Sequence, residues 1–545
     1  MPILTLLDRA MLDTYGRSGF WRDQTIYDIA AAHAATRPDA MAVRDAAGPL
    51  SYAALIAAAD ALATDLAARS VNPGDRVAVW LPSRAEVAVA LLACSRNGYV
   101  CCPSLHRDHT VAEIAALCRR MRATALVAQP GYGADAARAD VFATIEGLRH
   151  AYAIAPGLRT GLPEPSRATA PAPRRDPNGI VYPPFTSGTT GQPKGVLHSD
   201  NTLLANARAL SADWGFGPGS IIYTMSPLSH NLGLGALIAA LLVGGELVVH
   251  DLPRGASLYD RIVETRATFL FGVPTHAIDL LTELRARGAS SLGQVAGFRI
   301  SGAAAPAEIV AGLMRHGVVP QSGFGMTAIC SSLYTTPTDD PATIMETCGR
   351  ACPGFEVRIF RQDDPDSECA PGELGQIGGR GASLMLGYFD DQAATEAAFN
   401  ATGWFMTGDL GTLDAAGNLR ITGRAKDLII RGGHNIHPAQ IEDLAMRHPA
   451  IARAAAFPVP DDRLGERACL AIVPAPGTTL LDDALLAHLD AAGLSRFDMP
   501  EFVLRLDALP LTPSGKTPKR DLVQRVRDGA LHPTPVRFQM ETANG

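Results

Sequence analysis

The sequence has no excess of basic residues and no block of them. Its 545 residues include 48 Lys and Arg against 55 Asp and Glu, a formal net charge of −7. Nucleic-acid-binding proteins carry a clustered basic surface that neutralises phosphates. We therefore expect no nucleic-acid partner.

Long uninterrupted hydrophobic runs are also missing. The most apolar stretch, residues 232–249, contains glycines and a glutamate and is flanked by turn residues. It indicates a buried helix followed by a strand, and we expect no membrane span. The N-terminal segment has acidic residues within its apolar part and no small-residue cleavage site, so we expect no secretory signal.

Cysteine is scarce, and its pattern fits no disulfide framework. Nine cysteines, an odd number, are scattered through the chain, which favours free thiols in a reducing cytoplasm. Cys348 and Cys352 lie four apart, but no second ligand pair follows, so we predict no protein-built metal site there.

The length and the alternation of strand-like and helix-like segments predict an α/β fold with more than one domain. At 545 residues the chain exceeds a single core. Short β-branched runs alternate with Ala/Leu-rich helical stretches, which is typical of parallel sheets covered by helices. Examples are strands over 76–81 and 123–128 and helices over 85–94 and 111–121.

Two segments organise the chain further. Residues 156–178 are rich in Pro, Arg and Ala, and we interpret them as a surface excursion, not a domain boundary. We place the boundary at 425/426. It separates a large N-terminal domain, 1–425, from a small mobile α+β domain, 426–545, whose last dozen residues from His532 we expect to be loosely held.

The most informative motif is the string TSGTTGQPKG at 186–195. Hydroxyls and unhindered backbone N–H groups in one loop suit polyphosphate binding, and a lysine adds positive charge. The string is not the GxxxxGK[ST] loop, because no Ser or Thr follows the lysine. An ordinary Ser/Thr/Gly surface loop is the alternative. The candidate phosphate ligands are Thr186, Ser187, Gly188, Thr189, Thr190, Gly191 and Lys194.

This string resembles the phosphate loop of the class I adenylate-forming superfamily, which includes acyl-CoA synthetases, peptide-synthetase adenylation domains and luciferases. Further motifs follow in the order of that superfamily. SGAAAP at 301–306 resembles the turn, here Gly302, Ala303 and Ala304, that lets adenine and the acyl group approach the backbone. A small-residue turn between strand and helix is also common without any ligand.

The segment GFGMT at 323–327 resembles the superfamily's nucleotide-binding strand. The resemblance implies that Phe324 stacks on adenine and that the Thr327 hydroxyl holds the α-phosphate. Gly325, between them, is a further nucleotide-binding position of the segment. A plain core role for Phe324 is the alternative.

The segments WFMTGDL at 404–410 and GRAKD at 423–427 resemble the ribose-binding and hinge motifs. Asp409 would accept hydrogen bonds from both ribose hydroxyls, a role suited to a carboxylate. Arg424 would reach the ribose or phosphate. Lys426 would be the hinge about which the small domain, 426–545, turns relative to the ATP- and acyl-binding domain, 1–425. Charged residues beside a linker are otherwise usually solvated surface.

Three further segments complete the resemblance. Lys516, in PLTPSGKTPK, would bridge the substrate carboxylate and the α-phosphate and stabilise developing charge. Gly432 and Gly433 would let the CoA thiol pass. His230, in PLSHNLGLG, would be an acyl-pocket wall that positions the carboxylate or gates CoA entry, although a core histidine is equally compatible with the sequence.

One position departs from the pattern. Where the superfamily has a glutamate that helps hold the Mg²⁺ of MgATP, this chain has Ala328. A methyl group cannot ligate a hard cation. Water and phosphate could complete the shell, another acid could substitute, or adenylation could be weakened.

Together these motifs predict an ATP-dependent carboxylic acid:CoA ligase that forms an acyl-AMP and uses ATP, Mg²⁺ and coenzyme A. Two alternatives stay open: a stand-alone acyl-AMP ligase that loads a carrier protein, and an ATP-binding sensor without turnover. The resemblance favours a medium-chain or alicyclic acid such as cyclohexanecarboxylate. We expect a cytoplasmic protein, and a homodimer is compatible with the sequence.

Overall fold

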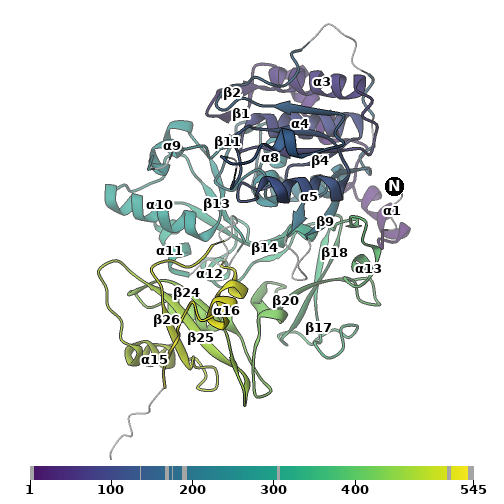
Figure 1. Cartoon of the computed structure of the whole chain (residues 1–545). Coiled ribbons are helices and arrows are strands. Elements are labelled where there is room, and N and C mark those ends of the chain that lie inside the picture. Colours follow the sequence, from purple (N-terminus) through teal and green to yellow (C-terminus); the bar gives the residue numbers. More distant parts are fainter. Residues whose placement is uncertain are drawn as a thin grey trace, which may run out of the picture. The chain divides into compact units, whose positions relative to one another are not determined.

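The computed structural model describes residues 5–135, 137–165, 171–174, 176–186, 193–253, 255–302, 307–511 and 517–537. The chain divides into two compact units (Figure 1). The first comprises 1–305, 309–357 and 379–405, and the second comprises 306–308, 358–378 and 406–545. The predicted boundary at 425/426 concerns a functional hinge and stays a prediction.

A nine-stranded sheet forms the centre of the first unit. Its strand order is β16-β15-β14-β13-β12-β10-β11-β1-β2, and the run from β14 to β1 is parallel. The strands are β1 (Met41–Asp45), β2 (Gly48–Ser51), β10 (Ile221–Thr224), β11 (Glu246–Val249), β12 (Phe269–Gly272), β13 (Gly297–Ile300), β14 (Val319–Met326), β15 (Cys330–Tyr334) and β16 (Arg350–Ala351).

Two smaller sheets belong to the same unit. One is parallel, in the order β4-β3-β5-β6, and the other is antiparallel, in the order β19-β9-β7, with β8 also paired to β9. Their strands are β3 (Arg76–Trp80), β4 (Val100–Cys102), β5 (Ala123–Ala128), β6 (His150–Ala153), β7 (Ile180–Tyr182), β8 (Phe185–Thr186), β9 (Lys194–Ser199) and β19 (Gly387–Tyr388).

Two helices of this unit are buried, and the second of them is apolar on every side. Every residue of α4 (Ala85–Asn97) is buried, and α4 contacts β1 as well as β3 and β4. Helix α8 (Asn231–Val243) contacts β10, β11 and β12 on one side and α2 and α7 on others. A helix without a polar face is stable only when it is covered all round. The predicted helix and strand over 232–249 are therefore α8 and β11.

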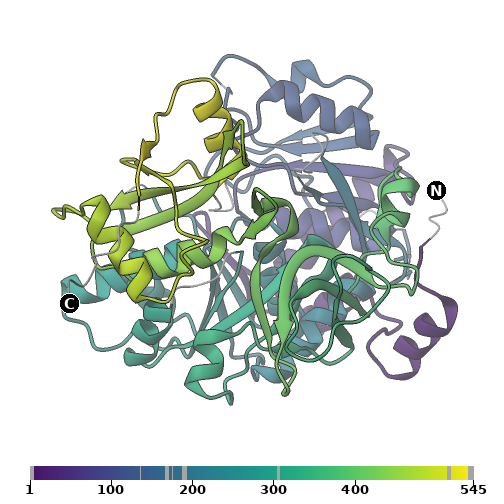
Figure 2. The same ribbon diagram turned by 90° about the horizontal axis from the view of Figure 1, so that it is seen from below.

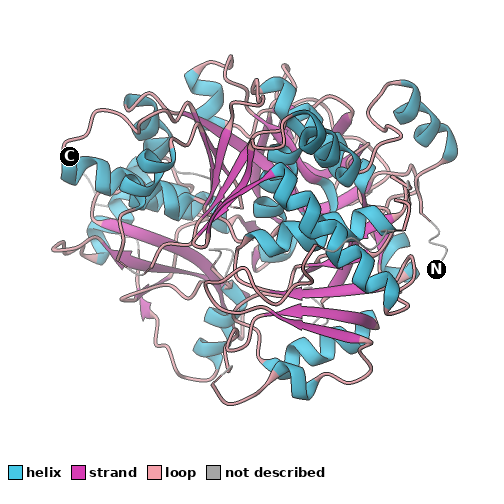
Figure 3. Cartoon of the chain, turned by 90° about the horizontal axis from the view of Figure 1, so that it is seen from above, coloured by secondary structure: helices cyan, strands magenta, loops and turns pink. Residues whose placement is uncertain are grey.

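The other helices of the unit cover the remaining faces of the sheets, as the cyan ribbons beside the magenta strands show (Figure 3). They are α1 (Arg9–Arg17), α2 (Ile26–Thr36), α3 (Tyr52–Ala68), α5 (Val111–Met121), α6 (Val141–Thr144), α7 (Asp200–Asp213), α9 (Leu258–Thr265), α10 (Pro274–Arg287), α11 (Ala307–Arg315), α12 (Pro341–Glu346) and α13 (Gln392–Glu396). No helix in the described ranges combines the length and the apolar character that a membrane crossing requires.

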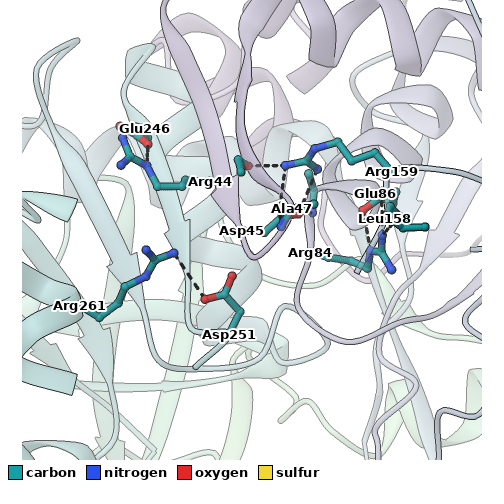
Figure 4. Close-up of polar contacts among 12 residues, drawn as sticks. Arg44, Asp45, Ala47, Arg84, Glu86, Leu158, Arg159, Glu246, Asp251 and Arg261 are labelled. Carbon is teal, nitrogen blue, oxygen red and sulfur yellow. Dashed lines mark hydrogen bonds and ion pairs between the residues drawn. The ribbon is translucent and has the colours of Figure 1, made fainter. Parts of the chain in front are cut away.

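A buried carboxylate ties the excursion after β6 to the sheets. Asp45 is 4% exposed, accepts two hydrogen bonds from Arg159 at 2.6 and 3.0 Å, and accepts the N–H of Ala85 at the start of α4 (Figure 4). Nearby, Arg84 pairs with Glu86 and donates to the carbonyl of Leu158 at 2.6 Å. These contacts fix residues 155–159 within the first unit, as expected for an excursion.

The C-terminal sheet has the order β23-β22-β25-β26-β27, with β24 also paired to β25, and its yellow-green strands are visible in Figure 2. Alternate residues of β24 and β25 face two different cores, one against α14 and α15 and the other against α16. The elements are β22 (Ile429–Arg431), β23 (His434–Ile436), α14 (Pro438–Met446), β24 (Ile451–Asp461), β25 (Gly465–Pro474), α15 (Asp482–Ala491), β26 (Phe502–Arg505), α16 (Lys519–Arg527) and β27 (Thr534–Pro535).

A separate four-stranded sheet, in the order β17-β18-β20-β21, precedes this module in the chain. The boundary between the two units runs through three of its strands. The strands are β17 (Phe355–Phe360), β18 (Gly375–Gly381), β20 (Phe405–Leu413) and β21 (Leu419–Arg424).

The predicted fold class is confirmed, with parallel-rich sheets and helices in the large unit and an α+β module at the C-terminus. One expectation is wrong. Residues 534–536, which follow His532, are not loosely held, because β27 pairs with β26 and Val536 donates its N–H to the carbonyl of Glu501 at 2.9 Å.

Asp45→Asn tests the buried anchor. The change leaves Arg159 without its buried counter-charge, so we expect the free energy of unfolding of the first unit to fall by about 2–4 kcal/mol. Urea unfolding followed by tryptophan fluorescence measures it. The control is Glu356→Gln, which removes a pair with Arg380 whose carboxylate is 57% exposed and should cost less than about 1 kcal/mol. Equal losses in the two variants would show that the Asp45 anchor contributes nothing special.

Candidate active site

Strands β8 and β9 form the base of the predicted phosphate loop. Thr186 and Lys194 are opposite each other in register, and the Thr186 hydroxyl donates to the carbonyl of Lys194 at 3.4 Å. The lysine Nζ lies 4.9 Å from the centre of the Tyr388 ring. Ser187, Gly188, Thr189, Thr190 and Gly191 lie outside the described residues. The two ends of the loop are thus held side by side, with one cation at its base.

Gly195 explains why β9 can lie so close to its neighbours. A Cβ at this position would be 2.9 Å from the Cβ of Phe389 and 3.1 Å from the ring of Phe185. The last glycine of the motif is therefore required by packing.

The GFGMT segment is the end of β14 and the turn into β15. The two strands are antiparallel, and the turn between them is a short 3₁₀ helix, Thr327–Ile329. A Cβ on Gly325 would be 2.2 Å from the carbonyl oxygen of Cys330, so only glycine fits. Phe324, on the opposite face, is 7% exposed. Its predicted stacking on adenine stays a prediction.

A histidine that the motif analysis overlooked fixes the backbone of Thr327. His198 is fully buried, and its Nε2 donates to the Thr327 carbonyl at 2.7 Å, which leaves Nδ1 facing the Thr202 hydroxyl at 3.1 Å. Burial lowers the pKa of His198 to about 4, so the ring is neutral at neutral pH. The signal in the sequence was a histidine only three residues after the phosphate loop motif, on the same strand.

His230 lies in a row of three imidazoles. Its ring stacks on His106 with centroids 4.1 Å apart, and His106 in turn lies 5.4 Å from His109. Burial lowers the pKa of His106 to about 4, and its Nδ1 lies 3.0 Å from the hydroxyl of Ser229. His230 is therefore held by an uncharged neighbour. Sequence reasoning missed His106, whose only signal was the pattern HRDH.

Gly302 lies two residues after the end of β13 and has φ of 93°, a backbone conformation that favours glycine. Ala303 and Ala304, the other members of this turn, lie outside the described residues. The conformation supports a tight turn at the carboxyl end of a parallel strand, where ligands bind in folds of this class.

In the second unit, Asp409 and Arg424 are opposite each other on β20 and β21. The arginine Nε donates to the carboxylate at 2.9 Å, and Asp409 is 5% exposed while the Arg424 side chain is 48% exposed. A buried carboxylate beside a mobile cation can accept ribose hydroxyls when the cation turns towards a phosphate. The structure brings together two residues that are 15 positions apart.

Lys426 lies in a short 3₁₀ helix, Ala425–Asp427, between β21 and β22. Gly432 and Gly433 form the turn between β22 and β23, both with positive φ, at 58° and 88°. A Cβ on Gly433 would meet nothing within 4 Å. The turn is therefore open on this side, as passage of a thiol arm requires.

Lys516 lies outside the described residues, but both flanks of its segment are anchored. Leu509 before it and Leu522 after it belong to one buried cluster with β24 and β25. Lys519, the first residue of α16, pairs with Glu442 at 2.7 Å.

Comparison with known proteins decides the family. Residues 30–389 match the family described as AMP-binding enzyme, and residues 440–516 match the AMP-binding enzyme C-terminal domain. The chain belongs to the AMP-binding enzymes. This family match confirms the resemblance read from the motifs, and ATP, Mg²⁺ and CoA are the cofactors of the acyl-CoA synthetases within the family.

Two relatives cover most of the chain. A medium-chain fatty-acid–CoA ligase of Escherichia coli (strain K12) is 30% identical over 532 residues, which cover 94% of this chain and 93% of the relative. A 3-[(3aS,4S,7aS)-7a-methyl-1,5-dioxo-octahydro-1H-inden-4-yl]propanoyl:CoA ligase of Mycobacterium tuberculosis is 34% identical, covering 84% and 90%. The ATP-bound crystal structure of MatB from Rhodopseudomonas palustris superposes with a TM-score of 0.81 at 28% identity, covering 93% and 99%.

Ala328 remains unusual within this AMP-binding enzyme. It is 3% exposed, and its carbonyl accepts the N–H of Met385 at 2.7 Å. The described residues contain no group of three or more His, Cys, Asp or Glu side chains placed to hold a metal ion. The described protein groups around Ala328 thus do not form a Mg²⁺ ligand set.

Ala328→Glu tests what the missing carboxylate costs. We expect faster acyl-adenylate formation or a lower Mg²⁺ requirement, because the carboxylate restores an oxygen ligand. Pyrophosphate release measured across Mg²⁺ concentrations reports both. Ala328→Gln has the same size without the charge and serves as the control. Unchanged or slower kinetics in the glutamate variant would show that the carboxylate is not what the site lacks.

His198→Gln tests the neutral histidine. The folded pKa of about 4 is below the ordinary 6.5, so the unfolded chain binds the proton first and stability falls as pH drops from about 6.5 to 4. We expect the melting temperature of the variant to depend less steeply on pH in this window, with its largest deficit relative to wild type near pH 7. Parallel pH profiles in the two proteins would contradict a buried neutral His198.

Proposed function

We propose that this protein is an ATP-dependent carboxylic acid:CoA ligase. The observation that carries the proposal is the near-complete match to a medium-chain fatty-acid–CoA ligase, which includes the C-terminal domain up to Lys516. The feruloyl-CoA synthase of an Amycolatopsis species, 30% identical over 512 residues, points to the same reaction class. The base of the phosphate loop, with Lys194, and the Asp409–Arg424 pair are groups of the kind that ATP binding requires.

In the first step, a carboxylate oxygen of the acid attacks the α-phosphorus of ATP, and the bond to the β-phosphate oxygen breaks, releasing pyrophosphate. Residues 186–194 would hold the β- and γ-phosphates, and Thr327, whose backbone His198 fixes, would hold the α-phosphate. Lys516 would bridge the carboxylate and the α-phosphate. Such a reaction is catalysed mainly by positioning and charge stabilisation.

In the second step, the CoA sulfur attacks the acyl carbon and the bond to AMP breaks, so that the thioester forms and AMP leaves. We propose that the module 426–545 pivots at Lys426 between the steps, withdrawing Lys516 and presenting Gly432 and Gly433. Division of a difficult condensation through an activated intermediate lowers each barrier.

For the acid, we propose a medium-chain or alicyclic carboxylate. The E. coli relative is named for medium-chain fatty acids, and the M. tuberculosis relative for a propanoate attached to a fused bicyclic ring. Transfer to a carrier protein and ATP binding without turnover are the weaker candidates, because many of the relatives are named as CoA ligases or synthases.

Localisation and assembly are also part of the proposal. All nine cysteines are free, which supports a reducing compartment, and we place the protein in the cytoplasm. A homodimer stays a prediction, which analytical ultracentrifugation would test.

Lys516→Ala tests the assignment of the two steps. We expect acyl-AMP formation from acid and ATP to fall at least about 100-fold, because charge stabilisation at the α-phosphate is lost. Thioester formation from supplied acyl-AMP and CoA should be largely retained. Arg527→Ala, at the exposed end of α16, is the control for the neighbourhood. Equal loss of both half-reactions would contradict the proposed role, and CoA-independent turnover with a carrier protein would favour the carrier-loading alternative.

A further inference from the structure

Arg299 is a fully buried cation without an acidic partner. Its exposure is 0%, and it forms no ion pair with any described carboxylate. Burial lowers its pKa only to about 10, so it is charged at neutral pH. A buried charge normally requires a counter-ion or full hydrogen bonding, because desolvation is costly.

The hydrogen bonds of this guanidinium are incomplete. One Nη donates to Gln321 Oε1 at 2.6 Å, and the other lies 3.4 Å from the carbonyl of Ser331. The Nε has no hydrogen-bond partner among the described residues, and neither does Gln321 Nε2. Two buried donors are therefore left for an acceptor that the described residues do not supply.

The sheet holds these groups in one row. Arg299 on β13 is in register with Phe271 on β12 and Gln321 on β14, so the three side chains lie on the same face. Gly323, two residues after Gln321, lies beside the same row: a Cβ there would be 3.0 Å from the carbonyl oxygen of Leu333 and 3.4 Å from an Nη of Arg299.

Arg299 lines a cavity of about 20 Å³ between this sheet and helices α7 and α8. Such a volume holds about one water molecule or one acceptor atom. Its other walls include Asn231, Cys330 and Gly235. A Cβ on Gly235 would meet nothing within 4 Å, so the space continues at this point of α8.

The cavity lies directly behind three of the site motifs. Asn231 follows His230, Arg299 is two residues before Ser301 and three before Gly302, and Cys330 is three residues after Thr327. The walls of the cavity are therefore continuous with the segments to which the acyl pocket and the α-phosphate are assigned.

We propose that Arg299, oriented by its hydrogen bond to Gln321, recognises a hydrogen-bond-accepting oxygen, a carboxylate or a ketone, at the end of the acyl substrate opposite the reacting carboxyl group. This inference rests on the proposed ligase function. A site built from unsatisfied donors discriminates strongly against an analogue that lacks the acceptor, because those donors then stay buried and unpaired.

The experiment compares acids that differ only at the far end. Hexanoate, octanoate and decanoate are each assayed against the dicarboxylate and the terminal methyl ketone of the same length, by pyrophosphate release with the full-length enzyme. We expect kcat/KM to favour an oxygen-bearing acid at least about tenfold at one length. Preference for the dicarboxylate over the ketone would identify the acceptor as an anion, and the reverse preference as a neutral oxygen.

Arg299→Met, of similar length and without charge, should abolish this preference by lowering kcat/KM for the oxygen-bearing acid while sparing the plain one. Gly235→Leu keeps the arginine and fills the cavity, and it should abolish the same preference, with Gly235→Ala as the size control. Thermal melting shows whether each variant is folded. If Arg299→Met does not fold, the comparison of Gly235→Leu with Gly235→Ala tests the proposal on its own.

The outcomes distinguish the inference about Arg299 from the proposed ligase function. Activation of plain and oxygen-bearing acids with equal kcat/KM in wild type, or an equal loss for both acids in Arg299→Met and Gly235→Leu, overturns the inference and leaves the ligase intact. Absence of pyrophosphate release with every acid overturns the proposed ligase function and this inference with it.

Discussion

The burial of α8 against the parallel strands of the large sheet is the constraint on which the candidate site depends. Its sequence is apolar all round, so it is stable only when it is covered on every side. That packing places the start of the helix, with His230 and Asn231, beside the row that Phe271, Arg299 and Gln321 form across the sheet. Helix and sheet together define both the histidine wall and the cavity behind it.

Some polar groups buried around this core have all their hydrogen bonds within the protein, and Arg299 does not among the described residues. Asp45 is satisfied within the protein by Arg159 and by the start of α4, and it serves to hold the fold together. His198 is likewise satisfied and fixes the backbone of Thr327. Arg299 differs, because its Nε lacks a described partner and it faces a cavity. Incomplete hydrogen bonding is thus what distinguishes a candidate substrate contact from a structural contact.

Much of the fold could be predicted from local sequence. Helix α5 and strand β5 have the expected bounds, and β3 and α4 begin at the predicted residues, because the hydrophobic periodicity of these segments is strong. The pairing of β27 with β26 was not predicted, since a two-residue strand has no periodicity. His106 and His198 were missed for a related reason: a single histidine acquires its role only from what surrounds it.

The sequence by itself determined the family and the order of the motifs, because loops that bind phosphate and ribose need particular residue types at fixed spacing. Only the tertiary structure decided which distant residues meet: Asp409 with Arg424, His106 with His230, and Arg299 with Gln321. Those pairings depend on strand register and helix packing, which join positions far apart in the chain. The substrate contact that we infer belongs to this second group, since nothing near Arg299 in the sequence reveals that its charge is buried without a carboxylate partner among the residues that the structure describes.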